Sequence, residues 1–186
     1  MVSAVAAFDR DSFVTHELDF RRAANGPVTL FWNPTVFAES TAWLRDAGYT
    51  LINVDTSDWG SDRDLHRDLA AALDFPDYYG ANLHGLNDCL SDVATYAYAS
   101  SEDATGLVLL LRHYDAFARR QTDLAQALLD IYASQARSAA LIGHRMLCLV
   151  QSDDPDLRFG PVGASPVTWN PDEFLDVRRH PDRDQR

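Results

Sequence analysis

The sequence predicts an α/β fold in which a small parallel sheet is flanked by helices. Short apolar runs of strand length alternate along the chain with segments whose leucines recur every three or four residues, which is the spacing of one helix face. Strands separated by helices become parallel neighbours through right-handed crossovers. The chain has 186 residues, 46% of them hydrophobic, so it is long enough to bury one sizeable core.

The first part of the chain predicts a strand followed by a helix. The run 28–32 is apolar and suits a strand buried on both faces. Asn33 and Pro34 come next and provide a helix N-cap and a first helical residue. The spacing of apolar residues predicts a helix over 35–47, which Gly48 ends.

The middle of the chain predicts a second strand, over 50–54, and then two helices. The first of these helices begins at Asp62 and ends before Pro76, and its leucines are spaced four apart. Asn82 is expected to cap the second helix. The residues expected on the core side of that helix are Leu83, Leu86 and Leu90.

The second half predicts two more strands, over 106–111 and 146–150, with a long helix over 122–137 between them. Leu124, Leu128 and Ile131 are expected to face inward from that helix. The sequence His113-Tyr114-Asp115 follows a strand and is expected to start a helix capped by local hydrogen bonds. The remainder is rich in Pro, Gly and Asp and predicts loops with one short strand over 167–169.

The charge of the chain restricts its partners. It has 28 acidic residues against 16 basic ones, a formal net charge of −12, and every basic residue is Arg. A nucleic-acid partner is therefore not expected, because phosphate backbones need a positive surface. A basic protein is a compatible partner, since an acidic surface attracts and steers it. Acidity that serves solubility alone is the other interpretation of the same composition.

Export, membrane insertion and catalysis are not expected. No apolar run approaches the roughly 20 residues that span a bilayer, and Met1 to Phe8 lack the features of a signal peptide. The predicted compartment is the cytoplasm, where Cys89 and Cys148 are expected to be free and buried. The sequence has no Gly-rich phosphate loop or nucleophile elbow, and no cofactor, metal site or catalytic residue is predicted.

One stretch resembles the barstar family of ribonuclease inhibitors. The family pattern is a helix followed by Pro-acid-Tyr-Tyr-Gly, one residue, and Asn-Leu, and this chain has Pro76-Asp77-Tyr78-Tyr79-Gly80-Ala81-Asn82-Leu83. The match begins at Leu65 and continues through Leu86, Asp88, Cys89 and Leu90. The resemblance implies a three-layer barstar-like domain over 50–152. Residues 1–49 are then an N-terminal extension that adds a strand and a helix, and 153–186 a loop-rich C-terminal extension.

The resemblance also implies a function. Proteins of this family block a ribonuclease inside the producing cell by placing the second helix and the loop before it into the cationic active site. Carboxylates there replace the RNA phosphate through charge-assisted hydrogen bonds. By position, Tyr78, Asn82 and Asp88 match family contact residues, with Asp88 as the principal phosphate mimic.

A helical wheel at about 100° per residue places Asp88 opposite the three core leucines. The same outer face carries Ala81, His84, Gly85 and Asp92, and the two small residues are expected to let a partner approach the backbone. The predicted partner-binding residues are Tyr78, Asn82, His84, Gly85, Asn87, Asp88 and Asp92. His84 and Asp88 have the i,i+4 spacing of half a metal site, but no second pair accompanies them.

The sequence departs from the family at three contact positions. His84 stands where a second carboxylate is common, Asn87 where an aromatic residue is common, and Ser134 or Gln135 where an acid is expected. Asp92, or Glu102 with Asp103, can supply the missing charge. Two alternatives stay open: an immunity protein for a different toxin effector, and a small-molecule binder or enzyme that uses a crevice at the carboxyl ends of the strands.

Overall fold

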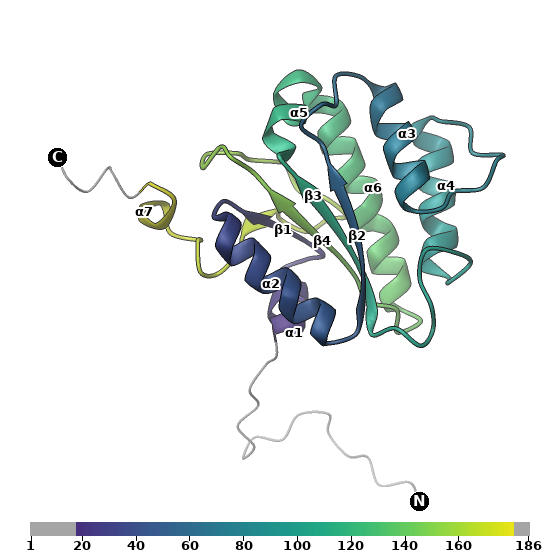
Figure 1. The fold of residues 1–186 in the computed structure, drawn as a ribbon, viewed down its shortest axis with the longest axis horizontal. Helices are drawn as coiled ribbons and strands as arrows, with labels where there is room; N and C mark the ends of the chain where they lie inside the picture. Colours follow the sequence, from purple (N-terminus) through teal and green to yellow (C-terminus); the bar gives the residue numbers. More distant parts are fainter. Residues whose placement is uncertain (1–17, 181–186) are drawn as a thin grey trace, which may run out of the picture.

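The computed structural model describes residues 18–180 of the chain (Figure 1). Met1 to Phe8, for which no export signal is predicted, lie outside the described residues. Five parallel strands form one sheet in the order β2-β3-β4-β1-β5. The strands are β1 Val28–Phe31, β2 Tyr49–Asp55, β3 Gly106–Arg112, β4 Met146–Gln151 and β5 Thr168–Trp169. The predicted α/β fold with a parallel sheet is confirmed, including the short strand near the C-terminus.

Helices cover both faces of the sheet, which gives three layers (Figure 1). The larger core packs one face against α3 Asp62–Ala72, α4 Leu83–Ala94, α5 Tyr114–Arg120 and α6 Thr122–Ala140. The smaller core packs the other face against α2 Pro34–Asp46, with α1 Leu18–Ala23 beside it. A last short helix, α7, spans Asp176–Arg179. Within residues 18–180, no helix has both the length and the apolar character needed to cross a membrane.

The central strand β3 shows why its sequence is apolar without alternation. Leu107, Leu109 and Leu111 lie in the larger core, whereas Val108 and Leu110 lie in the smaller one. Successive side chains of a strand point to opposite faces, so a strand with helices on both faces needs apolar residues at every position.

The N-terminal strand and helix belong to this sheet. β1 pairs with β4 on one side and with β5 on the other, and the ring of Phe31 meets that of Phe37 on α2 edge to face at 5.5 Å between centroids. Asn33 caps α2 as predicted, because its side chain accepts a hydrogen bond from the Thr35 N–H. The strand and helix at 28–47 therefore extend the sheet, while the division of the chain at 49/50 and 152/153 remains a prediction.

Three details of the helices differ from the prediction. Leu83 is 37% exposed and does not face the core. α6 continues to Ala140. Of the three α6 residues expected to face inward, only Leu128 is fully buried, because the buried face of the helix is centred on residues such as Ala125 and Tyr132. Leu124 and Ile131 lie half-buried at the border of that face.

The start of α5 was predicted in the right place but with the wrong cap. The helix begins at Tyr114, and the preceding His113 makes no side-chain capping bond. His113 instead adopts a left-handed backbone conformation, with φ 56° and ψ 35°, and its ring reaches Asp153 after β4. The two cysteines are free and buried, as predicted.

Candidate functional site

The loop over 73–82 and the start of α4 are locked together by Asn82. Its Oδ1 accepts the Gly85 N–H at 2.9 Å, and its Nδ2 donates to the Gly80 carbonyl at 2.9 Å. One amide thereby satisfies a helix N-terminal donor and fixes the turn before it. Asn82 therefore acts first as the cap that sequence predicted.

Tyr79 anchors the same loop to α3. Its hydroxyl forms a hydrogen bond with Nδ1 of the buried His66 on α3, and its ring packs edge to face against Phe75 at 4.9 Å. Burial raises the pKa of Tyr79, so the phenol stays protonated and its hydroxyl shares this hydrogen bond with the imidazole. Burial also lowers the pKa of His66, and the smaller effect of the Asp62 charge acts in the opposite direction. The pair therefore has a structural role, because it fastens the loop to α3.

Gly85 does not leave the backbone of α4 open to a partner, and this expectation was wrong. A Cβ at this position would lie 3.3 Å from both the Tyr79 ring and the Gly80 nitrogen. The glycine therefore accommodates the loop of its own chain. Ala81 is exposed, but it lies before the helix with φ at 44°, outside the regular face of α4.

The outer face of α4 carries Asp88 into solvent. Asp88 and His84 are both exposed, one turn apart, while the buried side of the helix consists of Leu86, Cys89, Leu90, Val93 and Ala94. The exposure predicted for Asp88 is confirmed. Its use in binding a partner stays a prediction.

Two apolar side chains flank this face. Tyr78 is 76% exposed at the tip of the loop, and Leu83 is 37% exposed in the first turn of α4. Sequence reasoning missed Leu83 because the helical wheel grouped it with the core leucines. The buried face is centred nearer Leu86 and Val93, so Leu83 lies at its border.

Asn87 is tied to the neighbouring helix. Its Oδ1 accepts a hydrogen bond from Gln135 Nε2 of α6 at 2.8 Å, and its Nδ2 lies 3.5 Å from Asp88 Oδ1. Both amide side chains are half-buried. Two positions at which the sequence departs from the family pattern thus form one neutral pair beside Asp88.

The carboxylates considered as substitutes lie in different surroundings. Asp92 is half-buried, and the Tyr98 hydroxyl lies 3.5 Å from its Oδ2 while donating to the Cys89 carbonyl at 2.9 Å. Burial is the main cause of a raised pKa of Tyr98, so this hydroxyl remains a donor. Glu102 and Asp103 are exposed in the segment that leads into β3.

The outer face of α4 is separate from the two cavities of about 500 Å³ found elsewhere in the described chain. Among residues 18–180, no group of three or more His, Cys, Asp or Glu side chains has the arrangement to hold a metal ion. Two cavities of about 500 Å³ are present in the described part of the chain, and neither is lined by a residue of α4. An exposed helix face that carries a carboxylate, with exposed apolar side chains in its first turn and in the loop before it, suits a macromolecular partner better than a small ligand.

The region that contains α4 matches a known protein family. A family model described as "Barstar (barnase inhibitor)" matches residues 49–151, which is more than half of the chain. A Bacillus subtilis (strain 168) protein named "Putative ribonuclease inhibitor YrdF" is 52% identical over 40 residues. Those residues are 22% of this chain and 44% of that protein, so the match spans less than half of the relative's length.

Proposed function

This chain belongs to the barstar (barnase inhibitor) family, and on that premise we propose that it inhibits a ribonuclease in the cytoplasm by covering the enzyme's cationic active site with α4 and the loop before it. The partner in this proposal is a basic protein, and the chain itself performs no catalytic step. The net charge of −12 supports attraction between the two.

The observation that carries the proposal is the exposed carboxylate of Asp88 on a rigid support. α4 is packed on the larger core through Leu86 and Leu90, which are 0% and 1% exposed. The helix is therefore held before a partner arrives, and little conformational entropy is lost on binding. A carboxylate fixed in this way can accept hydrogen bonds from Arg or Lys in place of a phosphate group.

The neighbouring residues supply the rest of the surface. Tyr78 and Leu83 offer apolar contact area at the loop tip and first turn, and exposed aromatic residues are frequent anchors of interfaces. His84 adds a donor one turn before Asp88. These residues would exclude water around the Asp88 contact, which strengthens its electrostatic interaction with the partner.

The first prediction tests Asp88 directly. Asp88→Asn removes the charge and keeps the shape, and the dissociation constant for the inhibited ribonuclease should rise by about thirtyfold or more, equivalent to at least ~2 kcal/mol. The measurement is inhibition of RNA cleavage by a panel of basic microbial ribonucleases.

Asp46→Asn is the matched control, because it removes one charge from an exposed position on α2, across the sheet from α4. Its inhibition should equal that of the unchanged chain. The proposal fails if excess protein leaves the whole panel fully active, or if Asp88→Asn inhibits as strongly as the control.

A second candidate is an immunity protein for a different toxin effector. It is favoured by the neutral pair of Asn87 and Gln135 and by His84, which leave Asp88 as the central carboxylate of this surface. Such a surface fits a partner with one strong cationic site rather than an extended one. Protection of cells that express a toxin encoded beside this chain, without inhibition of the ribonuclease panel, would favour the second candidate.

A further inference from the structure

A cavity of about 500 Å³ lies between α2 and the carboxyl ends of the central strands. Phe37 and Leu110 form its apolar part, and Arg45, Arg112 and His113 are among the polar residues that line it. Ligands of open parallel sheets bind in crevices outside the carboxyl ends of the strands, and cavities of this size hold small organic molecules.

The cavity depends on the N-terminal helix. Phe37 and Arg45 belong to α2, which precedes the residues 49–151 that match the barstar family. Across the sheet, α4 belongs to the other layer. The cavity is therefore separate from the proposed ribonuclease-binding surface, and the inhibitory function does not account for it.

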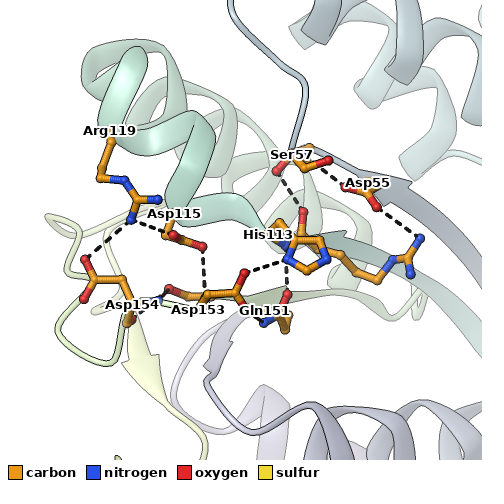
Figure 2. A network of polar contacts seen from close by, with 11 residues as sticks. Asp55, Ser57, His113, Asp115, Arg119, Gln151, Asp153 and Asp154 are labelled. Atoms are coloured by element: carbon orange, nitrogen blue, oxygen red, sulfur yellow. Dashed lines mark hydrogen bonds and ion pairs between the residues drawn. The ribbon is translucent and has the colours of Figure 1, made fainter.

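A polar network makes the rim of the cavity rigid, and Figure 2 shows its side chains gathered where β3 passes into α5. His113 Nδ1 lies 2.7 Å from Asp153 Oδ2, and the His113 N–H donates to Gln151 Oε1 at 2.8 Å. Gln151 Nε2 donates in turn to Asp153 Oδ1 at 2.9 Å. The Asp153 N–H donates to the buried Asp115, whose carboxylate is 2.6 Å from Arg119.

This network holds His113 in the left-handed conformation described above. That conformation costs free energy in a residue with a Cβ and persists only where the surroundings fix it. Two strand ends, β3 and β4, are thereby joined through side chains at the edge of the cavity. The rim is preorganised to receive a ligand without rearrangement.

The cavity is lined by cations in an acidic protein. The chain has 28 acidic residues against 16 basic ones, yet within the described residues no Asp or Glu side chain lines the cavity. Two carboxylates contact its lining residues: Asp153 lies against His113, and Asp55 Oδ2 lies 3.6 Å from Arg112 Nη2. Arg45 forms no side-chain ion pair with any residue of the described chain and stays exposed.

The guanidinium of Arg112 is poorly satisfied. Its contact with Asp55 is longer than a hydrogen bond, and its Nε is buried without an acceptor among residues 18–180. Buried donors in proteins are nearly always paired, so an unpaired one requires an explanation. A guanidinium has five N–H donors suited to carboxylate or phosphate oxygens.

We propose that this cavity binds a small organic anion, a carboxylate or a phosphate ester with a compact apolar body. Arg45 and Arg112 bind the anionic group, and the apolar body packs against Phe37 and Leu110. Asn53, which also lines the cavity, adds a neutral polar group on β2.

The test is a titration of the full-length, ¹⁵N-labelled chain with benzoate and with phenyl phosphate, followed by nuclear magnetic resonance. Saturable shifts at Arg45, Asn53 and Arg112 support the proposal, and the tighter of the two probes identifies the carboxylate or the phosphate as the preferred group. Benzamide is the neutral control and should bind at least about tenfold more weakly than the better anion.

Two variants locate the binding. Arg45→Gln should weaken the better anion by at least about tenfold, because a charge-assisted hydrogen bond is lost. Ala38→Phe adds a ring at an exposed helix position that lines the cavity, and saturable binding should disappear. Arg63→Gln, on α3 away from the cavity, removes the same charge and should leave the affinity unchanged.

Melting temperatures near that of the unchanged chain establish that the variants fold. The proposal is overturned if neither anion saturates, if benzamide binds as tightly as the anions, or if Arg45→Gln and Ala38→Phe bind like Arg63→Gln. No ribonuclease takes part in the experiment, so its result does not depend on the inhibitory function.

Discussion

At the scale of single residues, the position of the exposed Asp88 depends on contacts that hold α4 and the loop before it in place. His66 and Tyr79 fasten the loop over 73–82 to α3, and the ring of Tyr79 closes over Gly85 at the start of α4. Asn87, next to Asp88, is held by Gln135 of α6. Three contacts thus hold in place the helix that presents this surface carboxylate.

The buried His66 predicts a pH dependence of stability. Burial holds its pKa below the ordinary value of about 6.5, so the folded state prefers the neutral ring. The unfolded chain binds this proton more readily, and the stability contributed by His66 is present above pH ~6.5 and lost as the pH falls below it. We expect the free energy of unfolding to decrease from pH 7.5 to 5.5 in urea titrations.

His66→Asn is the comparison, because its amide can either donate to or accept from the Tyr79 hydroxyl and does not titrate in this range. Its stability should change less over the same interval. Equal slopes for the two proteins would rule out His66 as the titrating group. The carboxylates whose pKa values are lowered, such as Asp64 beside Ser61, lose their contribution only at more acidic pH.

At the scale of elements, α2 is part of the fold and not an appendage. It covers the face of the sheet formed by Val108, Leu110, Leu147 and Leu149, and without it these side chains would meet water. α2 also provides one wall of the proposed anion-binding cavity. Its packing therefore serves both stability and the second site.

Leu44→Ala tests the contribution of α2. Leu44 is fully buried in the smaller core, and its truncation should lower the free energy of unfolding by about 2–5 kcal/mol through lost contacts and a residual cavity. The matched control is Leu141→Ala, the same chemical change at a leucine that is 88% exposed, where a change of about 0.5 kcal/mol or less is expected. Similar losses in both variants, measured by urea unfolding, would contradict the packing of α2 on the sheet.

At the scale of the whole molecule, the excess of acidic residues creates a negative field around the protein. This field is not confined to α4, since exposed carboxylates such as Asp46 and Asp123 lie on other helices. Under the proposed function, long-range attraction would accelerate encounter with a basic partner, and the short-range contact of Asp88 would determine how long the complex lasts.

The separate roles of long-range attraction and short-range contact predict how binding depends on salt. Raising the ionic strength from about 0.05 to 0.5 M should slow association with the ribonuclease by about tenfold or more, because the screening length becomes shorter. The dissociation rate should change much less. Stopped-flow or surface-based kinetics measure both rates, and an association rate that is independent of salt would refute electrostatic steering.

Local sequence was sufficient for much of the fold. The caps at Asn33 and Asn82, the apolar strands and the leucine spacing of α3 predicted elements that the structure contains, because these features depend on neighbours within about one helix turn. The exposure of Asp88 followed from helix periodicity. The binding role of the α4 surface came from a family resemblance and remains to be tested.

Only the tertiary structure decided the contacts between residues far apart in the chain. The bond from Gln135 to Asn87 spans 48 positions and that from His113 to Asp153 spans 40, and no periodicity specifies such pairs. Gly85 and Leu83 were misjudged for the same reason, since a loop folded back over the glycine and the buried face of α4 was centred away from the leucine. Periodicity fixes which side of an element is apolar, whereas the packing of other elements against it decides what is covered and what remains open.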